Sequence, residues 1–195
     1  MRPTTLRLIA LLLMSTTLTG CAGVIMAGAV GGAVMVNDRR SFTTQVDDHG
    51  LDVAVTAALN EDDGLKNQSR IRVISMNRRV LLVGQVPNQM LKERAVQIAR
   101  SNPDVVQLHD QLRIGNPVGF TTQSNDTWTT TKVKSRMFSD NELDAMRIKV
   151  ITENGEVFLL GLVDPNEADL AVEVARTTSG VRKVVKVFEY QDANP

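Results

Sequence analysis

Cysteine, histidine and aromatic residues are all scarce in this chain of 195 residues. A single cysteine excludes an intrachain disulfide framework. The only two histidines, His49 and His109, lack a third ligand at metal-binding spacing, and no GxSxG motif is present, so we expect neither a metal site nor catalysis. Formal net charge is zero, which argues against broad nucleic-acid binding. What remains is an ordinary folded composition with 43% hydrophobic residues.

The N-terminus has the pattern of a secretory signal. Arg2 and Arg7 precede an apolar run from residue 8 to residue 14 that is too short to span a bilayer, and small or polar residues follow. We therefore expect residues 1–20 to be a signal peptide. The stretch LTGC, which ends at Cys21, resembles the lipobox of bacterial lipoproteins. That resemblance implies cleavage before Cys21, diacylglycerol on its sulfur and acylation of the new amino terminus. An ordinary signal with an incidental cysteine, or an uncleaved anchor, remains an alternative.

The segment after the cysteine is apolar and rich in small residues. Residues 22–36 read AGVIMAGAVGGAVMV, which is short for a transmembrane helix. We expect residues 21–46 to form a tether near the membrane interface, although the spacing of Gly28 and Gly32 leaves self-association open. Ala22, in place of Asp, implies by resemblance to enteric lipoproteins an outer-membrane anchor facing the periplasm.

One module occurs twice in the rest of the chain. The alignment rests on Ile71 with Ile148, Val73 with Val150, Gly84 with Gly161 and, after a shift of one residue, Ala99 with Ala175. Each copy reads helix, strand, tight turn, strand, amphipathic helix, strand. We predict an α+β fold of two α-β-β-α-β modules, each a three-stranded mixed sheet with two helices packed on one face.

The same pattern sets the domain boundaries. The expected parts are module 1 at 47–114, a linker at 115–125, module 2 at 126–191 and a tail at 192–195. Two acidic clusters look solvated at this stage. Residues 61–63 are expected in an exposed turn, and Glu153 and Glu156 bracket an exposed Asn-Gly hairpin turn.

The repeated motifs resemble the BON domain. Each copy carries a V-x-L-x-G-x-V strand and a downstream A-x-x-x-A-R helix, starting at Val80 and Val157 for the strands. Two such domains behind a lipobox resemble the dual-BON outer-membrane lipoproteins tied to division and envelope stress. The resemblance implies a periplasmic protein that binds anionic phospholipid, such as phosphatidylglycerol or cardiolipin, through its second domain. It implies no catalysis, no cofactor beyond the lipid on Cys21, and enrichment at the division septum.

The only tryptophan lies in the stretch DTWTTTKVKSRMF, residues 126–138. When the first helices of the copies are aligned at an offset of 78, Trp128 replaces Gly50 and Lys132 replaces Ala54, so the fold itself does not require these larger groups. At about 100° per residue they lie away from the core position Val133. We predict a phospholipid-docking face made of Trp128, Thr131, Lys132, Ser135 and Arg136. A tryptophan that caps the junction between the modules is the alternative.

These observations lead to one functional prediction. The protein is expected to be an outer-membrane lipoprotein that binds anionic phospholipid through module 2 and supports envelope integrity. The alternative is a periplasmic adaptor for the outer-membrane protein assembly machinery, in which an exposed sheet or helix of module 1 makes the contact.

Overall fold

The computed structural model describes residues 42–191, with side chains from Asp47 onward. The expected signal peptide, Cys21, the tether up to residue 41 and the tail at 192–195 lie outside the described residues. Within them the chain forms two modules of mixed α and β structure, and the predicted fold class is confirmed.

The two modules repeat one order of elements. Module 1 contains α3 (Phe42–Asn60), α4 (Asp63–Gln68), β1 (Arg70–Met76), β2 (Arg79–Val86), α5 (Gln89–Ser101) and β3 (Gln107–Ile114). Module 2 contains α6 (Phe120–Phe138), the short 3₁₀ turn η3 (Ala145–Arg147), β4 (Lys149–Glu153), β5 (Glu156–Leu160), β6 (Leu162–Val163), α7 (Pro165–Arg176), β7 (Lys183–Lys186) and β8 (Glu189–Tyr190).

Each main sheet has three strands with the hairpin's second strand in the centre. β1 and β2 pair antiparallel through a two-residue turn, and β3 returns parallel to β2 after the crossover helix α5. Module 2 repeats this order with β4, β5 and β7, while β6 and β8 form a short parallel pair. The mixed sheet therefore follows from one hairpin and one helical crossover.

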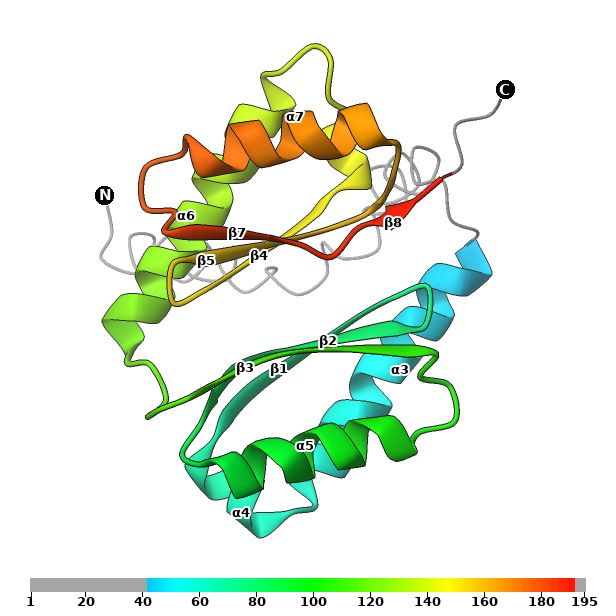
Figure 1. The fold of residues 1–195 in the computed structure, drawn as a ribbon, viewed down its shortest axis with the longest axis vertical. Helices are drawn as coiled ribbons and strands as arrows, with labels where there is room; N and C mark the ends of the chain where they lie inside the picture. Colours follow the sequence, from blue (N-terminus) through cyan, green and yellow to red (C-terminus); the bar gives the residue numbers. More distant parts are fainter. Residues whose placement is uncertain (1–41, 192–195) are drawn as a thin grey trace, which may run out of the picture. The chain divides into compact units, whose positions relative to one another are not determined.

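Helices cover one face of each sheet, as Figure 1 shows for α3 and α5 in module 1 and for α6 and α7 in module 2. Side chains cap the starts of α5 and α7. Asn88 accepts a hydrogen bond from the Leu91 N–H at the start of α5, and Asp164 forms a capping box with Glu167 at the start of α7. Each module thus has its own hydrophobic core between helices and sheet.

The other face of each sheet is also buried. Along β2, Val80 and Leu82 belong to the core of module 1, whereas the alternate residues Leu81 and Val83 join a separate cluster with Phe158 of β5. Alternation of side chains across a strand explains this division. Consecutive residues of the central strands, such as Val80 to Val83 in β2, are apolar because both faces of these strands are covered.

Charged pairs surround this third cluster. Arg70 Nη1 lies 2.6 Å from both carboxylate oxygens of Glu153, which Gln85 also contacts at 2.9 Å. Arg113 donates hydrogen bonds from Nε and Nη2 to the two carboxylate oxygens of Glu156. This hydrogen bonding raises the pKa of the Arg113 guanidinium. The expectation that Glu153 is exposed is wrong. Its side chain is only 4% exposed, because module 1 covers the hairpin that the local sequence presents as a free turn.

Two glycines allow strands to approach closely. Gly84 has φ of +129°, and a Cβ there would lie 1.9 Å from the Arg70 carbonyl oxygen on the paired strand. A Cβ on Gly161 would lie 2.8 Å from the Arg147 carbonyl oxygen. Close backbone approach therefore leaves no room for a side chain at either position.

Several boundaries differ from expectation. Helix α6 begins at Phe120, inside the expected linker at 115–125, and α3 begins at Phe42, inside the expected tether. The acidic turn at 61–63 is in part a helix start, since Asp62 accepts from the Leu65 N–H and caps α4. An N-cap side chain must turn toward the backbone, which explains why the Asp62 side chain is only 8% exposed.

Candidate membrane-docking surface

A buried carboxylate fixes helix α6 to its sheet. Asp126 accepts hydrogen bonds from the backbone N–H groups of Asn154 at 2.7 Å and Gly155 at 2.8 Å. These two residues form the β4–β5 turn, and both have positive φ, as a type I′ hairpin turn requires. The helix is therefore held in one position along the hairpin.

Module 1 uses the same device. Asp48 accepts from the backbone N–H groups of Asn77 and Arg78 at 2.8 and 2.9 Å. Asp48 and Asp126 are 78 positions apart, the offset used to align the helices, so Gly50 and Trp128 occupy equivalent places. Sequence reasoning missed both aspartates, although their recurrence at that offset was a usable signal.

The predicted centre of the docking face lies in the open. Thr129, Val133 and Met137 are buried and define the core side of α6. Trp128 lies roughly 140° around the helix from Val133, and its side chain is 64% exposed. An indole with that exposure does not fill a gap between the modules.

The four predicted neighbours of Trp128 divide into two groups. Thr131 and Ser135 are exposed on the outward side. Lys132 donates a hydrogen bond to the Ser179 carbonyl, and Arg136 donates to Thr178 Oγ1 at 2.9 Å. Arg136 also reaches the Val174 carbonyl at 3.3 Å, at the C-terminal end of α7, where cations are favoured. The two cations therefore lie at the edge of the face and also hold α6 against α7.

Three further exposed side chains were missed. Phe120 and Phe138 are 84% and 62% exposed, and Lys134 is exposed without a hydrogen-bond or ion-pair partner among the described residues. Phe120 and Phe138 are 18 residues apart, so they lie in line along the helix, about 27 Å from each other. We use the term α6 face for the outward set Phe120, Trp128, Thr131, Lys134, Ser135 and Phe138.

The phenylalanines differ in how well the sequence could reveal them. Phe138 aligns with Asn60 at the offset of 78, so the same comparison that singled out Trp128 could have found it. Phe120 aligns with Phe42 and shows no asymmetry, and it fell in the expected linker.

Module 1 has a cavity beside Gly50, the residue equivalent to Trp128. A cavity of about 560 Å³ is lined by Gly50, Leu51 and Ala54 on α3, together with Arg78 and Asp104. A Cβ on Gly50 would meet nothing within 4 Å. The larger residues of module 2 are thus an addition to the shared fold, not a requirement of it.

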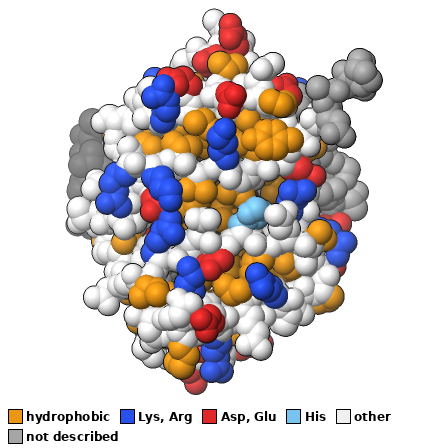
Figure 2. All heavy atoms as spheres, in the orientation of Figure 1, with side chains coloured by type: hydrophobic (Ala, Val, Ile, Leu, Met, Phe, Trp, Pro, Cys, Tyr) orange, Lys and Arg blue, Asp and Glu red, His pale blue; other side chains and the backbone are white. Residues whose placement is uncertain are grey.

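Basic and acidic side chains do not separate into large patches on the face shown in Figure 2. Figure 2 shows basic and acidic side chains intermingled over the face it presents, with hydrophobic side chains between them. No group of three or more His, Cys, Asp or Glu residues in the described range 42–191 could hold a metal ion. Burial, aided by Arg79, lowers the pKa of His109. Any attraction to an anionic surface therefore depends on individual cations near the apolar side chains.

No helix within residues 42–191 combines the length and apolar character needed to cross a bilayer. The α6 face is mixed in composition. It presents aromatic rings with hydroxyl groups between them and cations at both edges.

Comparison with known proteins matches both modules to one family model. The BON domain model matches residues 47–116 and 125–192. The chain is 41% identical to the outer membrane lipoprotein DolP of Haemophilus influenzae over 96% of this chain and 97% of that protein. It is 44% identical to the 21 kDa hemolysin of Actinobacillus pleuropneumoniae, covering 78% and 79% of the two chains.

Two more distant similarities were found. The chain is 31% identical to osmotically-inducible protein Y of Escherichia coli over 71% of its length and 70% of that protein. Among solved structures, the match to the C-terminal domain of CdsD from Chlamydia trachomatis covers 74% of this chain and 67% of that chain at 13% identity, with a TM-score of 0.30.

Proposed function

The chain belongs to the BON-domain family, and from that premise we propose that it is an outer-membrane lipoprotein that binds anionic phospholipid through the α6 face. The single observation that carries the proposal is the exposed Trp128 on a helix whose counterpart in module 1 has glycine at that position.

The location is supported by the relative that matches nearly end to end. That protein is named an outer membrane lipoprotein, and the alignment covers 96% of this chain. The expected lipid attachment at Cys21 agrees with such a location. We propose that acyl chains on Cys21 anchor the protein in the inner leaflet of the outer membrane, with the two modules in the periplasm.

The α6 face supplies the second contact. Tryptophan and phenylalanine favour the level of the lipid headgroups, where an indole ring is sheltered while its N–H stays hydrated. A lysine or arginine near an anionic surface contributes on the order of 1 kcal/mol, screened within about a Debye length. The Lys134 ammonium has no partner among the described residues and can face the lipid headgroups. Lys132 and Arg136, which also bond to the segment at the end of α7, add positive charge at the edge of the face.

Anchoring and docking are separate tasks. Two acyl chains suffice for stable membrane attachment, so the α6 face is not needed to keep the protein on the membrane. Tethering raises the local concentration of the face at its own leaflet, and even a weak site becomes occupied. We propose that the face selects anionic regions of the membrane, including the division septum, and that the protein acts by binding, without catalysis.

A charge reversal at the centre of the face tests the proposal. Residues 38–195 form one compact unit that contains all three hydrophobic clusters, so this fragment keeps the fold and lacks the acylated anchor. We expect Trp128→Glu to weaken binding to phosphatidylglycerol vesicles by about tenfold or more in a co-sedimentation assay.

Met90→Glu is the matched control, because Met90 is 65% exposed on α5 of module 1 and lies outside the α6 face. We expect this variant to bind as the unmodified fragment does. Equal binding of the Trp128→Glu variant and the control would reject the function proposed for this face.

A further inference from the structure

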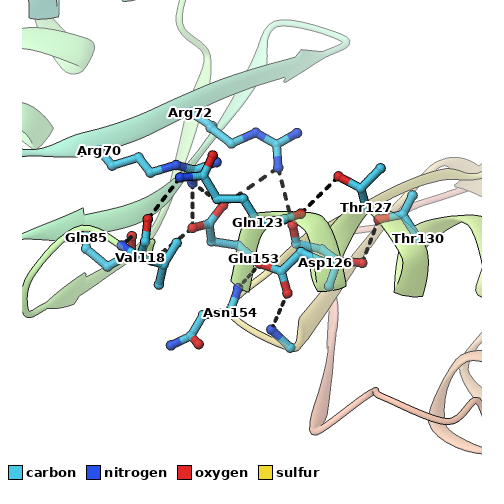
Figure 3. Close-up of polar contacts among 12 residues, drawn as sticks. Arg70, Arg72, Gln85, Val118, Gln123, Asp126, Thr127, Thr130, Glu153 and Asn154 are labelled. Atoms are coloured by element: carbon cyan, nitrogen blue, oxygen red, sulfur yellow. Dashed lines mark hydrogen bonds and ion pairs between the residues drawn. The ribbon is translucent and has the colours of Figure 1, made fainter. Parts of the chain in front are cut away.

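A polar cavity adjoins the α6 face. Its volume is about 320 Å³, and its walls come from β1 of module 1 and from α6 and β4 of module 2. The residues that matter most are Arg70 and Arg72 from β1 and Gln123, Thr127 and Thr131 from α6. Figure 3 shows the two arginines directed toward α6 and the hairpin of module 2.

Arg72 is the more exposed and the more weakly paired of the two arginines in this cavity. Its side chain is 40% exposed. Nη1 donates to the Thr152 carbonyl at 3.3 Å and lies 3.7 Å from Glu153 Oε2, and both contacts are long. Glu153 is already bound at 2.6 Å by Arg70. Among the described residues the remaining N–H groups of Arg72 have no acceptor, so the guanidinium is free to bind another anion.

Asp126 also lines the cavity, but the carboxylates near Arg72 already accept hydrogen bonds from other donors. Asp126 is 7% exposed and accepts from two backbone N–H groups, while Glu153 is 4% exposed and accepts from Arg70 and Gln85. The hydroxyls of Thr127 and Thr131 donate to helix carbonyls. The cavity therefore offers a guanidinium with unused donors beside carboxylates whose charge is offset by other donors.

The cavity opens beside the aromatic row. Thr131 belongs to both the cavity wall and the α6 face. At about 100° per residue, it lies roughly 20° around the helix from the line of Phe120 and Phe138 and roughly 60° from Trp128. A lipid whose glycerol backbone rests against these rings thus has its phosphate next to the cavity.

We propose that Arg72 of module 1 binds the phosphodiester of an anionic phospholipid docked on the α6 face of module 2. The proposal rests on the function proposed above and assigns module 1 a part in the site. Guanidinium matches the oxygens of a phosphate with two parallel hydrogen bonds. A choline headgroup brings a cation of its own close to Arg72, so the site favours headgroups such as glycerol that carry none.

The test compares Arg72→Gln with Arg100→Gln in residues 38–195. Both changes remove one positive charge from module 1, but Arg100 is exposed on α5 and does not line the cavity. We expect Arg72→Gln to weaken binding to phosphatidylglycerol vesicles about fivefold, as loss of one cation near the surface implies, and Arg100→Gln to leave binding unchanged. Equal affinities for the two variants would overturn the proposal.

A second measurement excludes an indirect effect through the module interface. In the unmodified fragment, we expect the Nε–Hε resonance of Arg72 to shift when phosphatidylglycerol vesicles are added, and to shift less with phosphatidylcholine vesicles or free inorganic phosphate. An unmoved Arg72 resonance would contradict the proposal even if Arg72→Gln binds weakly. If Trp128→Glu abolishes binding while Arg72→Gln does not, the docking function stands and the role of Arg72 is rejected.

Discussion

At the scale of single residues, a buried aspartate in each module joins the first helix to the hairpin turn. Asp48 and Asp126 each accept two backbone N–H groups from the hairpin turn of their own module. Buried charges need such partners, and the turn needs acceptors for its N–H groups. The sequence could not indicate this pairing directly, because the partners lie 28 to 30 positions away in the chain.

Asp52 is a residue whose burial is less well compensated. Its Oδ1 is buried without a hydrogen-bond partner among the described residues. Burial raises the pKa of Asp52 above its ordinary value of 3.8, and Ser75 and Lys149 offset this only in part. The ionised side chain therefore costs stability at neutral pH.

The pH dependence has a definite sign. The stability that protonated Asp52 contributes is complete below its unfolded pKa and is lost as pH rises through the raised folded pKa. We expect Asp52→Asn to raise the melting temperature at pH 7 by about 2 °C and to have no effect near pH 3. Asp47→Asn, an exposed change on the same helix, serves as control in melting curves from pH 3 to pH 8. A gain at pH 3 as large as that at pH 7 contradicts this account.

At the scale of elements, the sequence pattern predicted the type and order of helices and strands better than it predicted where they begin and end. The repeated pattern and the Asn-Gly turn predicted the order of strands and helices correctly. The sequence did not reveal where α6 begins, because the hydroxyl-rich stretch from Phe120 to Asn125 resembles a linker. That stretch is helical since Gly119 starts the helix and Gln123 bonds back to Val118.

The early start of α6 lengthens the proposed docking face. Phe120 is 84% exposed at one end and Phe138 is 62% exposed at the other. We expect Phe120→Ser and Phe138→Ser each to weaken vesicle binding about threefold to tenfold, because each removes one ring from the interface. Co-sedimentation with phosphatidylglycerol vesicles measures the change.

Val106→Ser is the control for the phenylalanine variants. Val106 is 69% exposed in module 1, away from the α6 face. Should it weaken binding as much as the phenylalanine changes do, binding depends on general surface hydrophobicity and not on α6.

At the scale of the whole molecule, the sheets of the two modules bury their second faces in a shared cluster. Module 1 supplies the donors Arg70, Asn77 and Arg113, and module 2 supplies the acceptors Glu153, Glu156 and Glu189. The sequence showed twin modules, but it could not show this pairing. An apolar strand run is compatible with burial by any partner, and ion pairs between distant strands leave no local pattern.

Removal of Glu153 tests how far the modules depend on each other. Glu153→Ala leaves Arg70 without its carboxylate, so we expect a loss of about 2 kcal/mol in unfolding free energy, less than for a fully buried pair because Arg70 is partly exposed. Chemical denaturation measures this loss. The exposed Glu142→Ala provides the baseline, and equal stability of the two variants would contradict a structural role for the interface.

The account as a whole depends on where lipid touches the protein. The most direct measurement is an NMR titration of residues 38–195 with phosphatidylglycerol vesicles, which follows backbone amides and the Trp128 indole N–H. We predict that the largest shifts fall on α6, at Trp128 and at Phe120, Thr131 and Phe138 around it. Shifts confined to module 1, or no shift at Trp128 at saturating lipid, would contradict membrane docking through module 2.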